Sequence, residues 1–157
     1  MTQAKQMPDI SPDMHDFLEL LIKHGVQFAL CGGFAVSYYG FIRTTMDIDI
    51  LVFPSADNAA RIMQALAEFG FGKAGIMPSA FERPGAVITL GAQPNQIDLL
   101  TSMSTEAADA IFADLQRAQI WGMTIPVVSR RSLMQAKKEA GRPKDRIDYE
   151  ELTALSE

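Results

Sequence analysis

The spacing of apolar residues along the chain predicts alternating helices and strands. Apolar side chains at helical spacing, such as Phe17, Leu18, Leu21 and Ile22, are typical of an amphipathic helix. Short apolar runs bounded by Gly or Pro are typical of buried strands. The predicted helices cover 13–24, 34–39, 56–69 and 105–116, the last with Thr105 as its cap. The predicted strands cover 26–31, 47–53, 86–91 and 96–101, with one or two more inside 118–128.

Two further helices are predicted at the C-terminal end. Ser129 is a capping residue for a helix that runs to about Ala140, and Gly141 ends it. Pro143 then starts a last helix that reaches about Leu155. We therefore expect an α/β (α+β) domain: a mixed β-sheet flanked by helices, with a C-terminal helical pair over 129–157. Residues 1–157 are predicted to form one domain, with 1–9 as a loose N-terminal segment.

Composition narrows the class of protein. The 157 residues carry a net charge of −5, which argues against a protein that coats nucleic acid. Residues 130–146 hold seven basic and two acidic side chains, a net +5, so the remainder carries −10. A basic segment in an acidic chain suggests an anionic ligand, although charge runs are more often solvated helix faces. There is no apolar segment of membrane-spanning length and no signal-peptide core, which predicts a cytoplasmic protein.

Asp47 and Asp49 form the most informative pattern. They alternate with Ile48 and Ile50 in a predicted strand, so both carboxylates lie on one face of the sheet. The alternative is an edge strand with a solvated face, but the run continues as Leu51-Val-Phe, apolar on both faces. Two neighbouring carboxylates in apolar surroundings are costly without a cation. Oxygen ligands without His or Cys favour Mg²⁺ or Mn²⁺.

Asp98 repeats this arrangement in a second predicted strand, between Ile97 and Leu99. By itself, one Asp in a strand is as often a turn residue as a ligand. If the two strands are neighbours, the three carboxylates of Asp47, Asp49 and Asp98 converge. Such a triad can hold two cations about 3.5–4 Å apart and serve phosphoryl-type transfer, with Asp98 nearest the attacking hydroxyl.

Upstream residues suggest phosphate binding. Gly32-Gly33 follows a predicted strand and precedes a helix, and such a turn permits close approach of the backbone to a ligand. Arg43, next to Thr44 and Thr45, has the geometry to hold phosphate oxygens in a bidentate manner. Ser37, one helical turn after Gly33, is a further candidate. Taken singly, each of these residues is more often a turn or surface residue than a ligand contact.

Together these residues resemble the minimal nucleotidyltransferases of the DNA polymerase β superfamily. The matching stretch runs from Gly32-Gly33 through Arg43-Thr-Thr45 to Asp47-Ile-Asp49, followed by a third carboxylate in a later strand. The end of the chain, from Lys138 to Asp145, is similar to bacterial stand-alone members related to abortive-infection and toxin–antitoxin nucleotidyltransferases. Many relatives have Ser where this chain has Gly33. The glycine lacks the serine hydroxyl that could donate a hydrogen bond to a phosphate oxygen.

The resemblance implies an enzyme that moves a nucleoside monophosphate from a nucleoside triphosphate to an acceptor and releases pyrophosphate. It implies Asp47, Asp49 and Asp98 as catalytic and metal-binding residues. The nucleotide-binding candidates are Gly32, Gly33, Ser37, Arg43, Thr45, Lys138, Arg142 and Lys144.

The sequence does not distinguish a small molecule, tRNA or a protein as the acceptor. A homodimer or partner chain is expected to complete the acceptor pocket. The competing hypotheses are a catalytically silent nucleotide-binding regulator, a toxin–antitoxin component that modifies tRNA or a partner protein, and a purely structural interaction domain.

Overall fold

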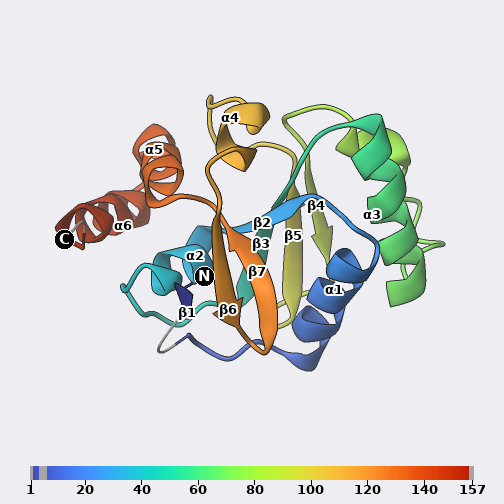
Figure 1. The fold of residues 1–157 in the computed structure, drawn as a ribbon, viewed down its shortest axis with the longest axis horizontal. Coiled ribbons are helices and arrows are strands. Elements are labelled where there is room, and N and C mark those ends of the chain that lie inside the picture. The colour runs from blue at the N-terminus through green and yellow to red at the C-terminus, as the bar shows by residue number, and fades with distance from the viewer. Residues whose placement is uncertain (1, 4–6, 156–157) are drawn as a thin grey trace.

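The computed structural model describes residues 2–3 and 7–155 (Figure 1). One mixed sheet organises the molecule, with strand order β1-β6-β7-β2-β3-β5-β4. The strands are β1 Thr2–Gln3, β2 Phe28–Cys31, β3 Asp47–Val52, β4 Val87–Leu90, β5 Gln96–Leu100, β6 Gln116–Ile120 and β7 Met123–Val127. The helices are α1 Pro12–Lys23, α2 Gly32–Tyr38, α3 Ala56–Phe69, α4 Ala108–Phe112, α5 Arg130–Ala140 and α6 Pro143–Ala154, with a 3-10 turn η1 Pro78–Phe81.

The sheet mixes parallel and antiparallel pairs, as the sequence predicts. Strand β3 runs parallel to β5 and antiparallel to β2. Strands β4 and β5 form an antiparallel hairpin, and β6 and β7 form another. The predicted fold class, a mixed sheet with flanking helices and a C-terminal helical pair, is therefore confirmed.

Local capping sets the bounds of the longer helices. The Ser55 hydroxyl accepts a hydrogen bond from Asn58 N at 3.0 Å, and Ser129 does the same for Ser132 N at the start of α5. Gly70 and Gly141 end α3 and α5 in the left-handed conformation, with φ of 106° and 66°. Because these signals are short-range, the observed bounds of α3 and α5 agree closely with the predicted ones.

The helix expected over 105–116 is shorter than predicted. It covers Ala108–Phe112, and Thr105 is not its cap. Instead, the Thr105 backbone N–H and hydroxyl donate to the Glu139 carboxylate at 2.8 and 2.7 Å, which ties this loop to α5. The N-terminal segment expected to be loose contains β1, which pairs with β6. Residues 1 and 4–6 of that segment lie outside the described residues.

Two pairs of helices lie on opposite sides of the sheet. Figure 1 shows α1 and α3 together on one side, and α5 and α6 packed as a pair on the opposite side. Ile48 and Ile50 of β3 are fully buried, as the alternating pattern predicts. No helix among the described residues is long and apolar enough to cross a membrane.

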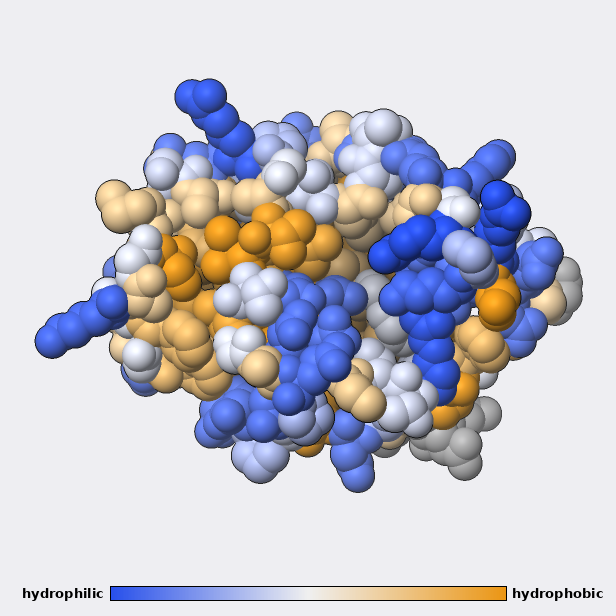
Figure 2. Space-filling model, turned by 180° about the vertical axis from the view of Figure 1, so that it is seen from behind, coloured by the Kyte–Doolittle hydropathy of each residue, from blue (hydrophilic) through white to orange (hydrophobic). Residues whose placement is uncertain are grey.

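The surface includes apolar areas beside strongly hydrophilic ones, as the view from behind in Figure 2 shows. Among the side chains that the structure describes, the most exposed large apolar ones are Met77, Val87 and Ile147, at 64%, 60% and 54%. Single exposed apolar side chains are common on protein surfaces, whereas large contiguous apolar patches are typical of sites that contact a ligand or another chain. The expected homodimer or partner chain stays a prediction.

Candidate active site

The pairing of β3 with β5 brings the three predicted carboxylates together. The parallel register places Asp49 directly beside Asp98, and Asp47 beside Gln96. Since residues two apart on a strand share a face, all three carboxylates project from the same side of the sheet. One carboxylate oxygen from each of Asp47, Asp49 and Asp98 lies within 4.8 Å of the other two. The sequence predicts this convergence only on the condition that the strands are neighbours, and the structure meets that condition.

Burial and the two neighbouring carboxylates raise the proton affinity of Asp49. Burial is the main cause that raises the pKa of Asp49 from 3.8 to about 7, and the negative charges of Asp47 and Asp98 add to it. The nearby Lys137 ammonium acts in the opposite direction. A cation that replaces this proton would stabilise the ionised carboxylate of Asp49. The oxygen-only donor set therefore fits a hard divalent ion such as Mg²⁺ or Mn²⁺.

Basic side chains from the C-terminal helical pair form the opposite wall of the site. A cavity of about 310 Å³ lies between the sheet and this pair. Its polar lining includes the three carboxylates on one side and Lys137, Arg142 and Lys144 on the other. The basic segment singled out by composition therefore faces the acidic triad, which suits a ligand that carries both a cation and phosphate groups.

Buried carboxylates of α6 hold the central lysine of that wall. Lys137 Nζ lies 3.0 Å from Asp148 Oδ2 and 3.5 Å from Asp145 Oδ1. The contact with Asp148 Oδ2 is an ion pair whose angle does not make a hydrogen bond. Asp148 also pairs with Arg43, and Asp145 accepts from Arg142 Nε at 2.6 Å. Asp145 and Asp148 are fully buried, so these contacts compensate charges that would otherwise be expensive.

Gly32 lies against the triad for a steric reason. Its φ is +66°, and a Cβ there would come within 2.0 Å of Asp49 Oδ2. A side chain at position 32 would therefore displace the central carboxylate. At Gly33, a Cβ would lie 3.2 Å from Thr45 Oγ1 and 3.3 Å from Arg43 Nη2. The space that a serine would need at position 33 is thus bordered closely by Thr45 and Arg43.

Comparison with protein families identifies the kind of enzyme. Residues 13–152 match the family model of aminoglycoside-2''-adenylyltransferase, which is most of the chain. The chain belongs to this family. It is a nucleotidyltransferase, as the resemblance to the DNA polymerase β superfamily implies. No curated protein matches it.

Solved structures agree with the fold of this nucleotidyltransferase. The antibiotic-resistance factor ANT(2'')-Ia superposes with a TM-score of 0.59 at 15% identity, over 92% of this chain and 83% of that one. A proposed nucleotidyltransferase from Thermotoga maritima gives 0.60 at 16%, over 93% and 96%. The lincosamide antibiotic adenylyltransferase LnuA gives 0.54 at 14%, over 95% and 100%. At these identities, the likeness concerns the fold.

The predicted nucleotide-binding residues of the nucleotidyltransferase fall into two groups. Gly32, Arg142 and Lys144 line the cavity. Gly33, Ser37, Arg43, Thr45 and Lys138 are not among its lining residues. Of these, Arg43 is engaged by Asp148, and the Thr45 hydroxyl donates to the Asp47 carbonyl at 3.1 Å. Ser37 is buried at 2% exposure, with no hydrogen-bond partner for its hydroxyl. Lys138 lies in a separate depression beside Tyr149.

Lys137 is a cavity residue that the sequence analysis did not select. It stands four residues after the buried Leu133, so it continues the inward face of α5, whereas Lys138 is exposed. The helical phase of Leu133 was the available signal, because a lysine on the apolar face of an amphipathic helix must find a buried partner or a ligand.

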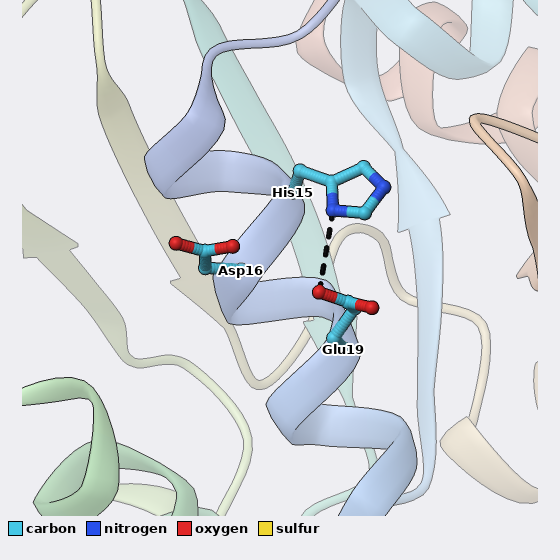
Figure 3. Close-up of side chains that lie close together, drawn as sticks. All are labelled: His15, Asp16 and Glu19. Carbon is cyan, nitrogen blue, oxygen red and sulfur yellow. Dashed lines mark ion pairs between the residues drawn. The ribbon is translucent and has the colours of Figure 1, made fainter.

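A second group of possible metal ligands lies on α1. Figure 3 shows His15 and Glu19 facing each other, with Nδ1 and Oε1 3.4 Å apart, and Asp16 beside them. His15 Nε2 lies 3.0 Å from the Trp121 carbonyl. Asp16 and Glu19 are exposed, and the contacts between His15 and Glu19 are those of an ordinary i,i+4 pair on a helix surface. We assign no function to this group.

Proposed function

We propose that this nucleotidyltransferase moves a nucleoside monophosphate from a Mg²⁺-bound nucleoside triphosphate to a hydroxyl of a small-molecule acceptor. The observation that carries the proposal is the cavity in which Asp47, Asp49 and Asp98 face three basic side chains. The family model names an adenylyl group, so ATP is the first donor to test. The same name makes aminoglycosides the first acceptors to test.

Each side of the cavity has its own role in this proposal. Asp47 and Asp49 would hold the divalent cation together with Asp98. Bound there, the cation would neutralise charge on the phosphates and on the attacking oxygen. Lys137, Arg142 and Lys144 would bind the triphosphate oxygens, and Gly32 keeps the backbone close to them. Asp98, on β5, would accept the proton of the acceptor hydroxyl.

The proposed transfer needs no reactant besides the nucleoside triphosphate and the acceptor. The acceptor oxygen forms a bond to the α-phosphorus, and the bond between that phosphorus and the α,β-bridging oxygen breaks. Pyrophosphate leaves with the electrons of the broken bond, and the hydroxyl proton passes to Asp98. The basic wall supports this step because the charge that develops on the leaving pyrophosphate lies next to positively charged side chains.

Thermal unfolding tests the donor side first. The protein is melted with ATP, CTP, GTP or UTP, each with Mg²⁺ or with EDTA, and Asp47→Ala/Asp49→Ala is compared with wild type. A ligand present at about 100 times its Kd stabilises the fold by about 2.7 kcal/mol, so the midpoint rises. We expect a Mg²⁺-dependent rise with ATP in wild type that is absent in the double variant.

A matched control removes two charges elsewhere. Asp9→Ala/Glu82→Ala loses two exposed acidic side chains and is expected to keep the ATP response. The acceptor is then sought by measuring pyrophosphate release with aminoglycosides, lincosamides and tRNA. Absence of any Mg²⁺-dependent shift with all four triphosphates at millimolar concentration would refute the proposed donor site. Donor binding without transfer to any acceptor would favour the silent regulator.

A further inference from the structure

The carboxylate of Asp98 is held by two neighbouring side chains. Thr89 Oγ1 donates to Asp98 Oδ1 at 2.7 Å. Gln96 Nε2 lies 3.2 Å from the same oxygen and 3.1 Å from Oδ2, so its amide is shared between the two. Oδ1 therefore accepts from two side chains and Oδ2 from one. These contacts leave Oδ2 as the oxygen with more free lone-pair capacity.

The sheet register places both donors beside Asp98. Thr89 is directly opposite Asp98 in the antiparallel pair of β4 and β5. Gln96 lies two residues before Asp98 on β5, on the same face, and opposite Asp47 on β3. The side chains of Cys31, Asp49, Asp98 and Thr89 therefore form one row across four strands. Thr89 closes this row on the side away from Asp49.

We propose that Thr89 and Gln96 are positioning residues that fix the Asp98 carboxylate for cation binding. The inference rests on the proposed function, because it concerns the same cation. An aspartate carboxylate rotates about χ2 with little cost unless it is held. The hydrogen bonds from Thr89 and Gln96 select one orientation of the carboxylate, in which one Asp98 oxygen lies within 4.8 Å of a carboxylate oxygen of both Asp47 and Asp49. Thr89 and Gln96 act through Asp98 and do not themselves ligate the cation.

Outer hydrogen-bond partners of metal ligands have measurable effects. Their loss typically lowers metal affinity or activity by about 10–100-fold. Thr89 makes the shorter bond, so its loss is expected to have the larger effect. Thr89→Val keeps the β-branched shape that suits a strand and removes only the donor. Because Thr89 is exposed on β4, the substitution leaves the packed core unchanged.

The test measures the affinity for Mn²⁺ directly, from the electron paramagnetic resonance signal of free Mn²⁺, with the full-length protein. Thr89→Val is expected to raise the Kd by about 10-fold or more, and Thr89→Ser, which restores a hydroxyl, is expected to return it near the wild-type value. Thr124→Val is the matched control, since it removes an exposed threonine hydroxyl on β7, outside the cavity lining. Its Kd is expected to equal that of wild type.

A double-variant cycle tests whether Thr89 acts through Asp98. In the Asp98→Asn background, Thr89→Val is expected to add no further change in Kd, because the group that it positions has already been altered. An unchanged Kd in Thr89→Val, no recovery in Thr89→Ser, or an equal effect in the Asp98→Asn background would overturn the inference. Failure of the proposed function looks different: wild type itself binds no Mn²⁺, or Asp47→Ala/Asp49→Ala binds it equally well.

Discussion

Asp49→Asn is expected to stabilise the metal-free protein at alkaline pH. Burial and the charges of Asp47 and Asp98 raise the Asp49 pKa from 3.8 to about 7. The folded state therefore holds a proton that the unfolded state has lost between these two pH values. Stability contributed by this proton is complete below about pH 3.8, falls as the pH rises through about 7, and is gone above that. Asparagine imitates the protonated form at every pH.

The magnitude follows from the separation of the two pKa values. Each pH unit between the folded and unfolded pKa corresponds to about 1.36 kcal/mol, so the full penalty at pH 8 is about 4 kcal/mol. Asp49 is only partly buried, and solvent lowers this value to about 2–4 kcal/mol. For a domain of this size, each kcal/mol shifts the midpoint by about 2–4 °C. The expected gain of Asp49→Asn at pH 8 is thus about 4–16 °C.

The assay is thermal unfolding in EDTA at pH 5, 6, 7 and 8, with Asp9→Asn as an exposed control. The midpoint difference between Asp49→Asn and wild type is expected to grow with pH, while that of the control stays flat. With Mg²⁺ and ATP, the order is expected to reverse, because only wild type retains the proposed cation site. A pH-independent difference in EDTA, or a wild type that is more stable at pH 8, would refute this account of Asp49.

Two further predictions concern the walls of the cavity. Asp148→Ala leaves the cations of Arg43 and Lys137 without their shared buried partner. The free energy of unfolding, measured by denaturant titration, is therefore expected to fall by about 3–5 kcal/mol. A decrease of less than about 1 kcal/mol would contradict the importance of these ion pairs. Gly32→Ala adds a Cβ within 2.0 Å of Asp49 Oδ2. The resulting displacement of the carboxylate should abolish the Mg²⁺-dependent ATP shift, and a retained shift would show that the turn adapts.

Local signals made most of the fold predictable. Ser55 and Gly70 bracket α3 with contacts inside four residues of each end, so the sequence shows both. The helix expected to begin at Thr105 failed for the opposite reason: the hydroxyl bonds to Glu139, 34 residues away. A capping residue and a residue with a distant partner have the same identity in the sequence. Only the packing of α5 distinguishes them.

The candidate site likewise combines features that a local sequence pattern predicts with features that depend on distant residues. The alternation of Asp47 and Asp49 with isoleucines is a local pattern, and it fixes their common face. Asp98 joins them only because β3 pairs with β5. A single sequence does not show which strands pair or in which register. Arg43 illustrates the limit most clearly. Its guanidinium, expected to bind phosphate, pairs with Asp148, a residue 105 positions further along the chain.

The cavity joins two walls of opposite charge that are stabilised in different ways. On the sheet side, burial and then the negative charges of Asp47 and Asp98 raise the pKa of Asp49 to about 7, and Lys137 only partly opposes them. On the helical side, Asp145 and Asp148 both pair with Lys137, and Asp148 also attaches α6 to the loop that carries Arg43. The acidic wall therefore favours a bound cation, whereas much of the positive charge opposite is already paired inside the protein. A triphosphate without its divalent ion would meet the unscreened triad, so donor and cation are expected to bind together.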